Sequence, residues 1–179
     1  MNQSKINMNR LLIIVLAMLL PFMKGYCLNQ GDIVFQTSKS AQSKYIALAT
    51  GSIYTHCGVI VKVKGKDYVL EASKKVQLTP LDKWIAKGQF GHYKVRKCNK
   101  RNFKVNTKKY LNKPYDTQFK WDNAKMYCSE LVYKVYQDNG ITLCKLRKVK
   151  DYHIFFLKKY IKKRGISLEQ LVVAPSDLL

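Results

Sequence analysis

Three residues have the chemistry of a covalent hydrolase: Cys128, His56 and Glu71. A thiol becomes a useful nucleophile as its thiolate, and both a helix N-terminus and a neighbouring imidazolium lower a thiol pKa. A carboxylate beside the imidazole fixes its tautomer and stabilises its charged form. The three residue types together therefore predict attack by sulfur on an amide or ester carbonyl.

The segment around Cys128 has the pattern of an amphipathic helix over residues 126–139. Apolar residues recur at i, i+1, i+4 and i+5, and they are Leu131, Val132, Val135 and Tyr136. Asn139-Gly140 is typical of a helix C-terminus. Cys128 is then expected in the first turn, where unpaired backbone N–H groups can also stabilise an oxyanion.

His56 and Glu71 lie on two predicted strands, residues 56–63 and 68–72, that flank a turn at Gly65. Antiparallel pairing across this turn brings the two side chains within about two positions of register. From the residues alone other interpretations stay open, because a cysteine is often a buried apolar residue and a strand glutamate often faces solvent. His92 and His153 have no carboxylate partner that pairing would supply, so surface or structural roles are expected for both.

No metal site is predicted. A zinc ion held by His56, Glu71 and Cys128 would lack the two ligands close in sequence that catalytic zinc sites usually show. The chain also has no C-x-x-C pair, and no cofactor is expected.

Periodicity and turn signals predict an α+β domain with a mainly antiparallel sheet. Further strands are expected at 31–36, 75–78, 90–97 and 171–175, and further helices at 38–50, 80–87, 100–111 and 151–164. Before the second of these helices, Thr79 is expected as the cap and Pro80 at the first helical position. Trp84 and Trp121 are expected to be packing residues.

The N-terminus resembles a secretory signal peptide. Lys5 and Arg10 precede an apolar run, residues 11–23, that is shorter than the about 20 residues needed to span a bilayer. We expect cleavage after Cys27, so that residues 1–27 are the signal peptide and 28–179 form one exported, periplasmic or extracellular domain. A disulfide between Cys98 and Cys144 in that oxidising compartment is left open.

The chain of 179 residues carries a formal charge of +22, and loss of Lys5, Arg10 and Lys24 with the signal leaves 22 − 3 = +19. Such a charge favours polyanionic partners, here anionic lipid head groups, lipopolysaccharide or wall polymers, and thus membrane-surface contact. Lysines spread over a solvated surface that keep the protein soluble are the preferred explanation of the charge. Only five of the 33 basic residues are arginine, which argues against a nucleic-acid partner.

Several short motifs in one order resemble the circularly permuted NlpC/P60 cysteine hydrolases of the YiiX/YebB-like group. They are Gly31-Asp32-Ile33-Val34-Phe35, Ser52-Ile53-Tyr54-Thr55-His56-Cys57-Gly58-Val59, Leu70-Glu71-Ala72, Thr79-Pro80-Leu81-Asp82-Lys83-Trp84-Ile85, Lys113-Pro114-Tyr115-Asp116 and Tyr127-Cys128-Ser129-Glu130-Leu131-Val132-Tyr133. The resemblance spans nearly the whole chain after residue 27. It implies a papain-like fold in which the histidine precedes the cysteine.

The resemblance also implies residue roles: Cys128 as nucleophile, His56 as base and Glu71 as the polar third residue. Tyr127 and Tyr115 match motif positions that line the substrate cleft or help to hold the oxyanion. Asp32 is implied to bind a substrate amine, although capping a turn suits it equally. Cys57 departs from the family, which often has an aliphatic residue there, and strand alternation aims it away from the His56 face.

Three functions are consistent with these observations. The first is an exported cysteine hydrolase that cleaves an amide in a cell-wall peptide or amino-acyl amide. The second is a lipid esterase or acyltransferase of the same fold, which the basic charge would suit. The third is a non-catalytic basic binding module of the cell envelope.

Overall fold

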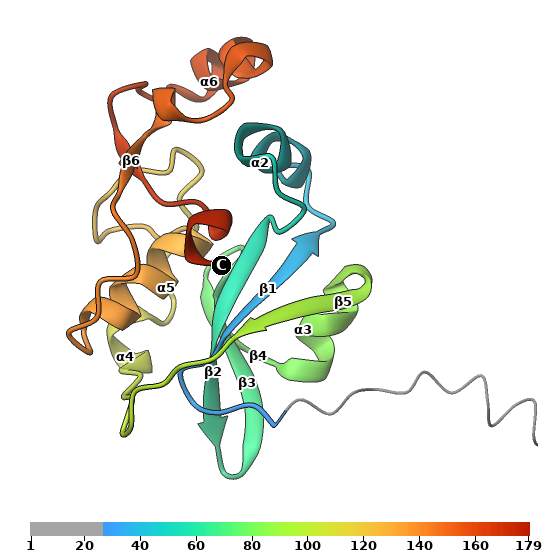
Figure 1. Cartoon of the computed structure of the whole chain (residues 1–179), viewed down its shortest axis with the longest axis vertical. Coiled ribbons are helices and arrows are strands. Elements are labelled where there is room, and N and C mark those ends of the chain that lie inside the picture. The colour runs from blue at the N-terminus through green and yellow to red at the C-terminus, as the bar shows by residue number, and fades with distance from the viewer. Residues whose placement is uncertain (1–26) are drawn as a thin grey trace, which may run out of the picture.

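A computed structural model describes residues 27–179, and its centre is a five-stranded antiparallel sheet (Figure 1). The strands follow the order β4-β3-β2-β1-β5. Their bounds are β1 Ile33–Ser38, β2 His56–Val63, β3 Lys66–Ala72, β4 Val76–Pro80 and β5 Gly88–Arg96. Alternation along these strands gives two buried faces, each of which packs against a helix.

The helices are α2 Ser43–Thr50, α3 Leu81–Lys87, α4 Thr107–Tyr110, α5 Cys128–Gln137 and α6 Lys158–Arg164. The larger core lies between α5 and one face of the sheet, where Leu131 and Val132 meet Phe35 and Val59. The smaller core lies on the other face around Trp84 of α3. The predicted α+β class is therefore confirmed.

The chain after α5 builds a smaller C-terminal region. It contains a two-stranded ribbon of β6 (Arg147–Lys148) and β7 (Leu171–Val172), three 3-10 turns and α6. The 3-10 turns are η1 Val149–Asp151, η2 Phe155–Leu157 and η3 Pro175–Leu178. A small apolar cluster that includes Leu157 and Ile161 joins this region to Tyr45 and Ala49 of α2. In Figure 1 α6 lies at one end of the molecule, above α2, and the β2–β3 turn lies at the other.

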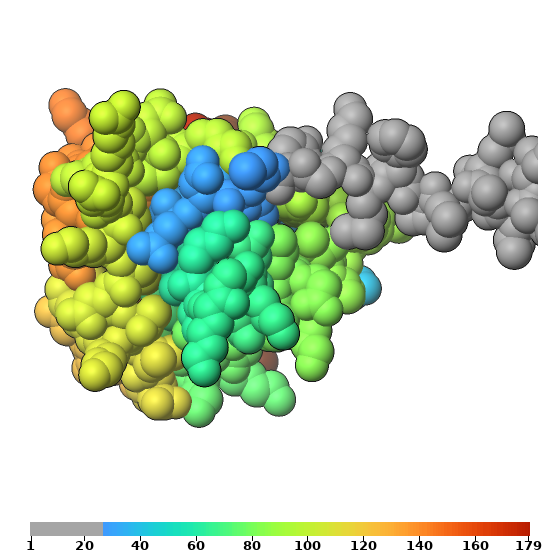
Figure 2. Space-filling view, turned by 90° about the horizontal axis from the view of Figure 1, so that it is seen from below, coloured from blue at the N-terminus to red at the C-terminus, as the bar shows by residue number. Residues whose placement is uncertain are grey.

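The predicted helix over 100–111 is wrong except for α4. Phe103 is pinned in the core, with its ring centroid 4.7 Å from that of Tyr136, and it fills the space that a side chain at Gly31 would need. The Asn139 side chain accepts the Lys104 backbone N–H and donates to the Lys104 carbonyl, at 2.9 and 2.8 Å. These contacts hold the segment outside a helix. Figure 2 shows this part of the chain in yellow-green beside the teal β2–β3 turn.

Other expectations were correct only in part. The helix predicted over 151–164 is limited to α6, because η1 and η2 interrupt it. Pro80 precedes the first residue of α3 instead of occupying it, and Thr79 makes no capping hydrogen bond to this helix. Strand β6 was not predicted, since two residues are too few for a periodic signal.

The predicted signal peptide lies outside the described residues except for Cys27, so it stays a prediction. Within residues 27–179, no helix is long and apolar enough to cross a membrane. The five cysteines, all in this part of the chain, are free, including Cys98 and Cys144.

Candidate active site

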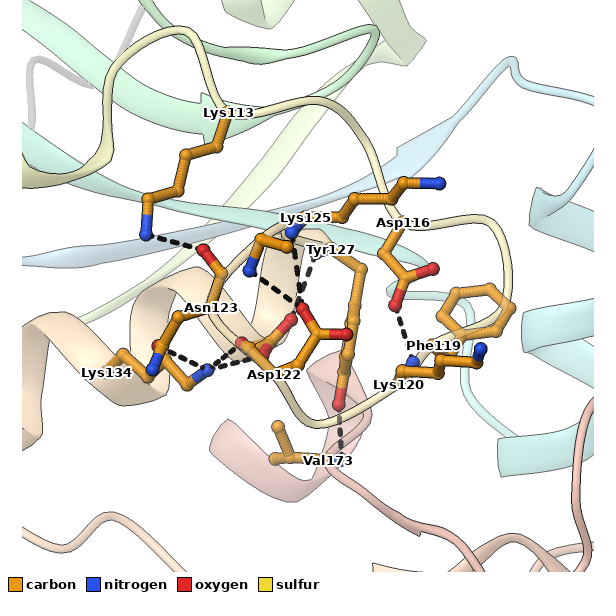
Figure 3. Close-up of polar contacts among 12 residues, drawn as sticks. Lys113, Asp116, Phe119, Lys120, Asp122, Asn123, Lys125, Tyr127, Lys134 and Val173 are labelled. Atoms are coloured by element: carbon orange, nitrogen blue, oxygen red, sulfur yellow. Dashed lines mark hydrogen bonds and ion pairs between the residues drawn. The ribbon is translucent and has the colours of Figure 1, made fainter.

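Cys128 is the first residue of α5, as the helical pattern predicted, and its two neighbours hold it there. The Tyr127 hydroxyl accepts the Val173 backbone N–H at 3.2 Å. The Ser129 hydroxyl donates to the Val173 carbonyl at 2.7 Å, and the Tyr127 N–H donates to Glu130 Oε2 at 3.4 Å. Figure 3 shows the Tyr127 ring directed toward Val173. The C-terminal region thus fixes the turn that presents the thiol.

A lysine-centred network braces the same turn from the other side (Figure 3). The Lys134 ammonium donates to Glu130 Oε1 at 2.6 Å, to Asn123 Oδ1 at 3.1 Å and to the Asp122 carbonyl. Lys113 donates to the Asn123 carbonyl at 2.8 Å. Burial raises the pKa of Glu130 to about 7, although Lys134 opposes the rise. The loop before α5 is therefore tied to the helix itself.

His56 and Glu71 meet as strand pairing predicted. His56 Nε2 lies 2.7 Å from Glu71 Oε2, and their side chains are 12% and 2% exposed. Glycine at position 58 permits this close packing, since a Cβ there would lie 2.4 Å from Val69 Cγ1 and 2.8 Å from the Leu70 carbonyl. With Nε2 occupied by the carboxylate, the ring has Nδ1 to offer to a second partner.

The other oxygen of Glu71 is also fully engaged. Glu71 Oε1 accepts hydrogen bonds from Thr79 Oγ1 at 2.6 Å, Lys87 Nζ at 3.1 Å and Gln77 Nε2 at 3.4 Å. Burial alone would raise the pKa of Glu71, but His56, Thr79 and Lys87 outweigh it and lower the pKa to about 2. The carboxylate is therefore ionised over the whole physiological range. Nothing in the sequence pattern marked Thr79 or Lys87 for this role.

The thiol of Cys128 is acidic and the imidazole of His56 is basic. The pKa of Cys128 lies well below its usual value, and the largest cause is a hydrogen bond from the Cys57 thiol. Burial opposes this shift, but a hydrogen bond with His56 and the charge of His56 add to it. Burial would lower the pKa of His56, yet hydrogen bonds with Cys128 and Glu71 raise it to about 10. Both shifts favour the ion pair of thiolate and imidazolium over the neutral pair.

Cys57 lies on the opposite strand face from His56, as alternation predicted. His56 faces Trp84, with ring centroids 6.1 Å apart, whereas Cys57 is fully buried in the core beside α5. Burial and the nearby Cys128 raise the pKa of the Cys57 thiol. Cys57 is therefore a neutral hydrogen-bond donor toward Cys128, a contact that alternation alone could not reveal.

An apolar cavity of about 120 Å³ begins at Cys128. It lies between α2 and the C-terminal region. Its walls come from five segments, residues 45–50, 119, 127–129, 149–166 and 172–175. Apart from Cys128 no ionised side chain lines it, and most of its wall is apolar, so it suits a hydrocarbon group.

A second hollow, of about 260 Å³, opens at His56 and Glu71. Its lining is polar and basic, with Lys74, Lys87 and Gln36 among its residues. Gln36 is 2% exposed, and within the described part of the chain its Oε1 has no hydrogen-bond partner. This hollow suits a polar or anionic group.

The remaining predicted site residues separate into near and distant ones. Tyr115 lines the polar hollow, and burial together with the nearby Cys128 raises its pKa, so its hydroxyl is a neutral donor. Tyr127 lines the apolar cavity, and its hydroxyl accepts a hydrogen bond from the Val173 backbone N–H.

Asp32 is distant from the candidate site. It is fully buried before the first residue of β1, whereas Gln36, which lines the polar hollow, lies toward the other end of this strand. The Asp32 carboxylate accepts hydrogen bonds from the backbone N–H groups of Asn29 and Cys98 and from the Lys97 ammonium. His92 and His153 are exposed.

The sheet, the cysteine at a helix start and the histidine on an earlier strand define a permuted papain-like protein. A model of the permuted papain-like amidase enzymes, the YaeF/YiiX or C92 family, matches residues 27–177, and the chain belongs to this family. It is therefore a cysteine amidase or peptidase.

Two relatives support the assignment. The uncharacterized protein YiiX of Escherichia coli strain K12 is 39% identical over 180 residues, which cover 93% of this chain and 89% of that protein. A crystal structure described as the metalloprotein yiiX from Escherichia coli O157:H7 matches with a TM-score of 0.76 and 39% identity. The match covers 84% of this chain and 91% of that one.

Proposed function

We propose that Cys128, His56 and Glu71 are the catalytic residues of an exported cysteine amidase. The observation that carries the proposal is the 2.7 Å contact of His56 with a buried glutamate, on strands that face the first turn of α5. A charged imidazole held in this way stabilises the Cys128 thiolate and orients the proton that the reaction needs.

The chemistry follows from these positions. The Cys128 thiolate attacks the amide carbonyl carbon, and the carbonyl electrons move to the oxygen, which unpaired N–H groups at the start of α5 stabilise. The neutral hydroxyl of Tyr115 is a further donor. The oxyanion then collapses, the C–N bond breaks and His56 gives its proton to the leaving amine. Neutral His56 next takes a proton from water, which hydrolyses the thioester and releases the acid and Cys128.

The two hollows support an orientation of the substrate. The apolar cavity at Cys128 is suited to the acyl side of the amide, and the polar hollow at His56 is suited to the amine side. An acyl group of hydrocarbon character on a polar amine, such as an amino acid, fits this arrangement best. Cell-wall peptides and other amino-acyl amides that carry an apolar residue at the acyl position remain within the proposal.

The test is hydrolysis of a small amide panel by the chain without residues 1–27. N-lauroyl-glycine, N-acetyl-glycine and a polar wall peptide such as alanyl-γ-glutamyl-diaminopimelate are compared by release of free amine. We expect the lauroyl amide to be cleaved fastest, and cleavage to disappear in Cys128→Ala. No hydrolysis of any amide by a folded protein with an alkylatable Cys128 would contradict the proposal.

A lipid esterase or acyltransferase is the second candidate, because the apolar cavity and basic charge favour it. In that case a phospholipid ester takes the place of the amide, and the acyl group passes from Cys128 to water or to another acceptor. Release of fatty acid from phosphatidylglycerol at a rate above that of amide cleavage would favour it. Intact phospholipid after long incubation would exclude it.

Export is tested by fractionation. The full chain with its first 27 residues, expressed in a bacterial host, is expected outside the cytoplasm and shortened at its N-terminus, whereas the chain lacking these residues is expected to stay inside. Mass spectrometry of the mature N-terminus tests cleavage after Cys27.

One of the similar solved structures is described as a metalloprotein. Within residues 27–179, no group of three or more His, Cys, Asp or Glu side chains is arranged to hold a metal ion. The donor side chains in this part of the chain therefore do not fit such a site. Activity is expected to be unchanged after dialysis against a chelator.

A further inference from the structure

Two phenylalanines project into solvent from η2, at the end of the molecule where α6 lies. Phe155 is 73% exposed and Phe156 is 85% exposed, and their ring centroids are 5.0 Å apart. Neither ring lines the apolar cavity. Adjacent aromatic rings on a surface usually mark a site of interaction.

Four lysines adjoin these rings on the outer face of α6. Lys158, Lys159, Lys162 and Lys163 are all exposed, and their spacing of i, i+1, i+4 and i+5 places them on one side of the helix. Lys158 Nζ lies 5.6 Å from the centre of the Phe155 ring. The two aromatic rings and four lysines are called the Phe-Lys surface below.

Acidic side chains do not neutralise the Phe-Lys surface. The sequence has none from Tyr152 to Leu168. Of the two that bracket this stretch, Glu169 pairs with Lys148 and Lys150, and Asp151 accepts the Lys148 backbone N–H. The surface therefore combines exposed apolar area with uncompensated positive charge.

The opposite side of the same segment faces the protein. Leu157 and Ile161 are buried, and with Tyr160 they form part of the wall of the apolar cavity that reaches Cys128. These inward residues explain why a helix with five basic residues among seven is stable here, and why its lysines must point outward.

We propose that the Phe-Lys surface docks the protein on an anionic phospholipid bilayer. Aromatic rings insert at the boundary between head groups and acyl chains, and lysines beside them bind anionic head groups, which is how interfacial helices attach. A nucleic acid would use the lysines but would leave η2 without a role. A soluble acidic protein would use both features, and it is distinguished in the test.

Docking does not depend on the proposed catalytic triad. It would bring the segment that forms part of the cavity wall, with Leu157 and Ile161, close to the bilayer, where acylated substrates are found. Binding is measured without any substrate, and hydrolysis of a soluble amide is measured separately. If the protein does not bind vesicles, the proposed catalysis is unaffected. If it does not hydrolyse the soluble amide, the proposed docking is unaffected.

The test is co-sedimentation of the chain lacking residues 1–27 with vesicles of phosphatidylcholine alone or with 30–40% phosphatidylglycerol, the latter mixtures on the order of cellular anionic content. We expect binding to the anionic vesicles and little to the neutral ones. Replacement of Lys162 and Lys163 by Gln is expected to weaken binding about 25-fold, since each lysine near the surface contributes roughly fivefold.

Matched variants control for charge and apolar area. Lys64→Gln with Lys66→Gln removes two exposed lysines at the β2–β3 turn, at the opposite end of the molecule (Figure 1), and is expected to reduce binding less than threefold. Phe156→Ala is expected to weaken binding on the order of tenfold. Phe90→Ala, which removes an equally exposed ring from β5, is expected to change it little.

Outcomes against the proposal are equally clear. No binding to anionic vesicles at low salt would overturn it, as would equal losses in the Lys162/Lys163 and Lys64/Lys66 variants. Binding that is unaffected by Phe156→Ala, or binding to polyglutamate as tight as to vesicles, would assign the surface to general polyanion attraction and would also overturn it.

Discussion

The two hollows, one lined by Cys128 and the other by His56, differ in chemistry and in origin. The apolar cavity is assembled from α2, the start of α5 and the C-terminal region. The polar hollow is formed mainly by residues at or beside the ends of the sheet strands, including Gln36 and Glu71, together with Lys87 at the end of α3. One side of the candidate site is thus built by the sheet and its hairpin connections, and the other by segments added around it.

The difference indicates that the two hollows have separate roles in the reaction. The polar side holds the groups that set proton transfer, because Glu71 is fixed by Thr79 and Lys87 as well as by His56. Apart from Cys128 and tyrosine hydroxyls, the apolar side is lined mainly by hydrocarbon groups, so it contributes chiefly shape and burial. Changes on the polar side should therefore alter the rate of chemistry, and changes on the apolar side should alter which acyl group is accepted.

The largest effect is expected from replacing the nucleophile, Cys128. Cys128→Ala should reduce hydrolysis of every substrate by at least about 10³-fold, because no other group can form the thioester. Loss of the covalent acyl-enzyme in mass spectrometry checks this. Cys144→Ala is the control, and comparable loss of activity in the control would argue against Cys128.

Glu71→Gln should be the next most damaging change, lowering kcat on the order of 10²-fold. It should also move the alkaline limb of the pH profile. Loss of the His56 proton ends protonation of the leaving amine, so wild-type activity should fall as pH rises through about 10. Without the carboxylate the pKa of His56 falls, so the limb should shift to lower pH. An unshifted limb would show that Glu71 does not act through His56.

Filling the apolar cavity should change selectivity. Ala49 lines it, so Ala49→Phe should raise KM for a lauroyl amide by about tenfold and leave an acetyl amide unaffected. Ala47→Phe is the matched control, since Ala47 is on the same helix but does not line the cavity. Equal effects on both amides would mean that the acyl chain binds elsewhere.

The smallest effect is expected from Lys87→Gln. The Lys87 side chain is half exposed, so its attraction for an anionic amine portion is screened and should be worth only a few-fold in KM. The rise in KM should appear with N-lauroyl-glycine and be absent with its uncharged amide analogue, whereas a small loss of kcat from the missing contact of Lys87 with Glu71 should be the same for both substrates. Lys83→Gln, an exposed change on the same helix, should affect neither substrate.

The polar side was more accessible to sequence reasoning than the apolar one. Two strands joined by a tight turn fix the separation of His56 and Glu71 from local pairing alone, and a periodic helix fixes where Cys128 begins it. Thr79 was misassigned as a helix cap because its hydroxyl instead donates to Glu71 across two paired strands. That choice depends on side-chain direction, which spacing does not specify.

The apolar cavity could not be predicted, because its walls are far apart in sequence. Ala49, Phe119, Ile161 and Val173 become neighbours only through tertiary packing. The same reason explains the error at 100–111, where the contact of Phe103 with Tyr136 overrides a weak helical pattern.

The hydrogen bonds of Val173 with Tyr127 and Ser129 have a consequence for biosynthesis. The ribosome must add 173 − 128 = 45 residues after Cys128 before Val173, which steadies the turn that carries the thiol, has been made. Until then the sheet and α5 can assemble with a sulfur that is not yet held in its final position. A nascent chain would thus acquire an ordered thiol only when its synthesis is almost complete.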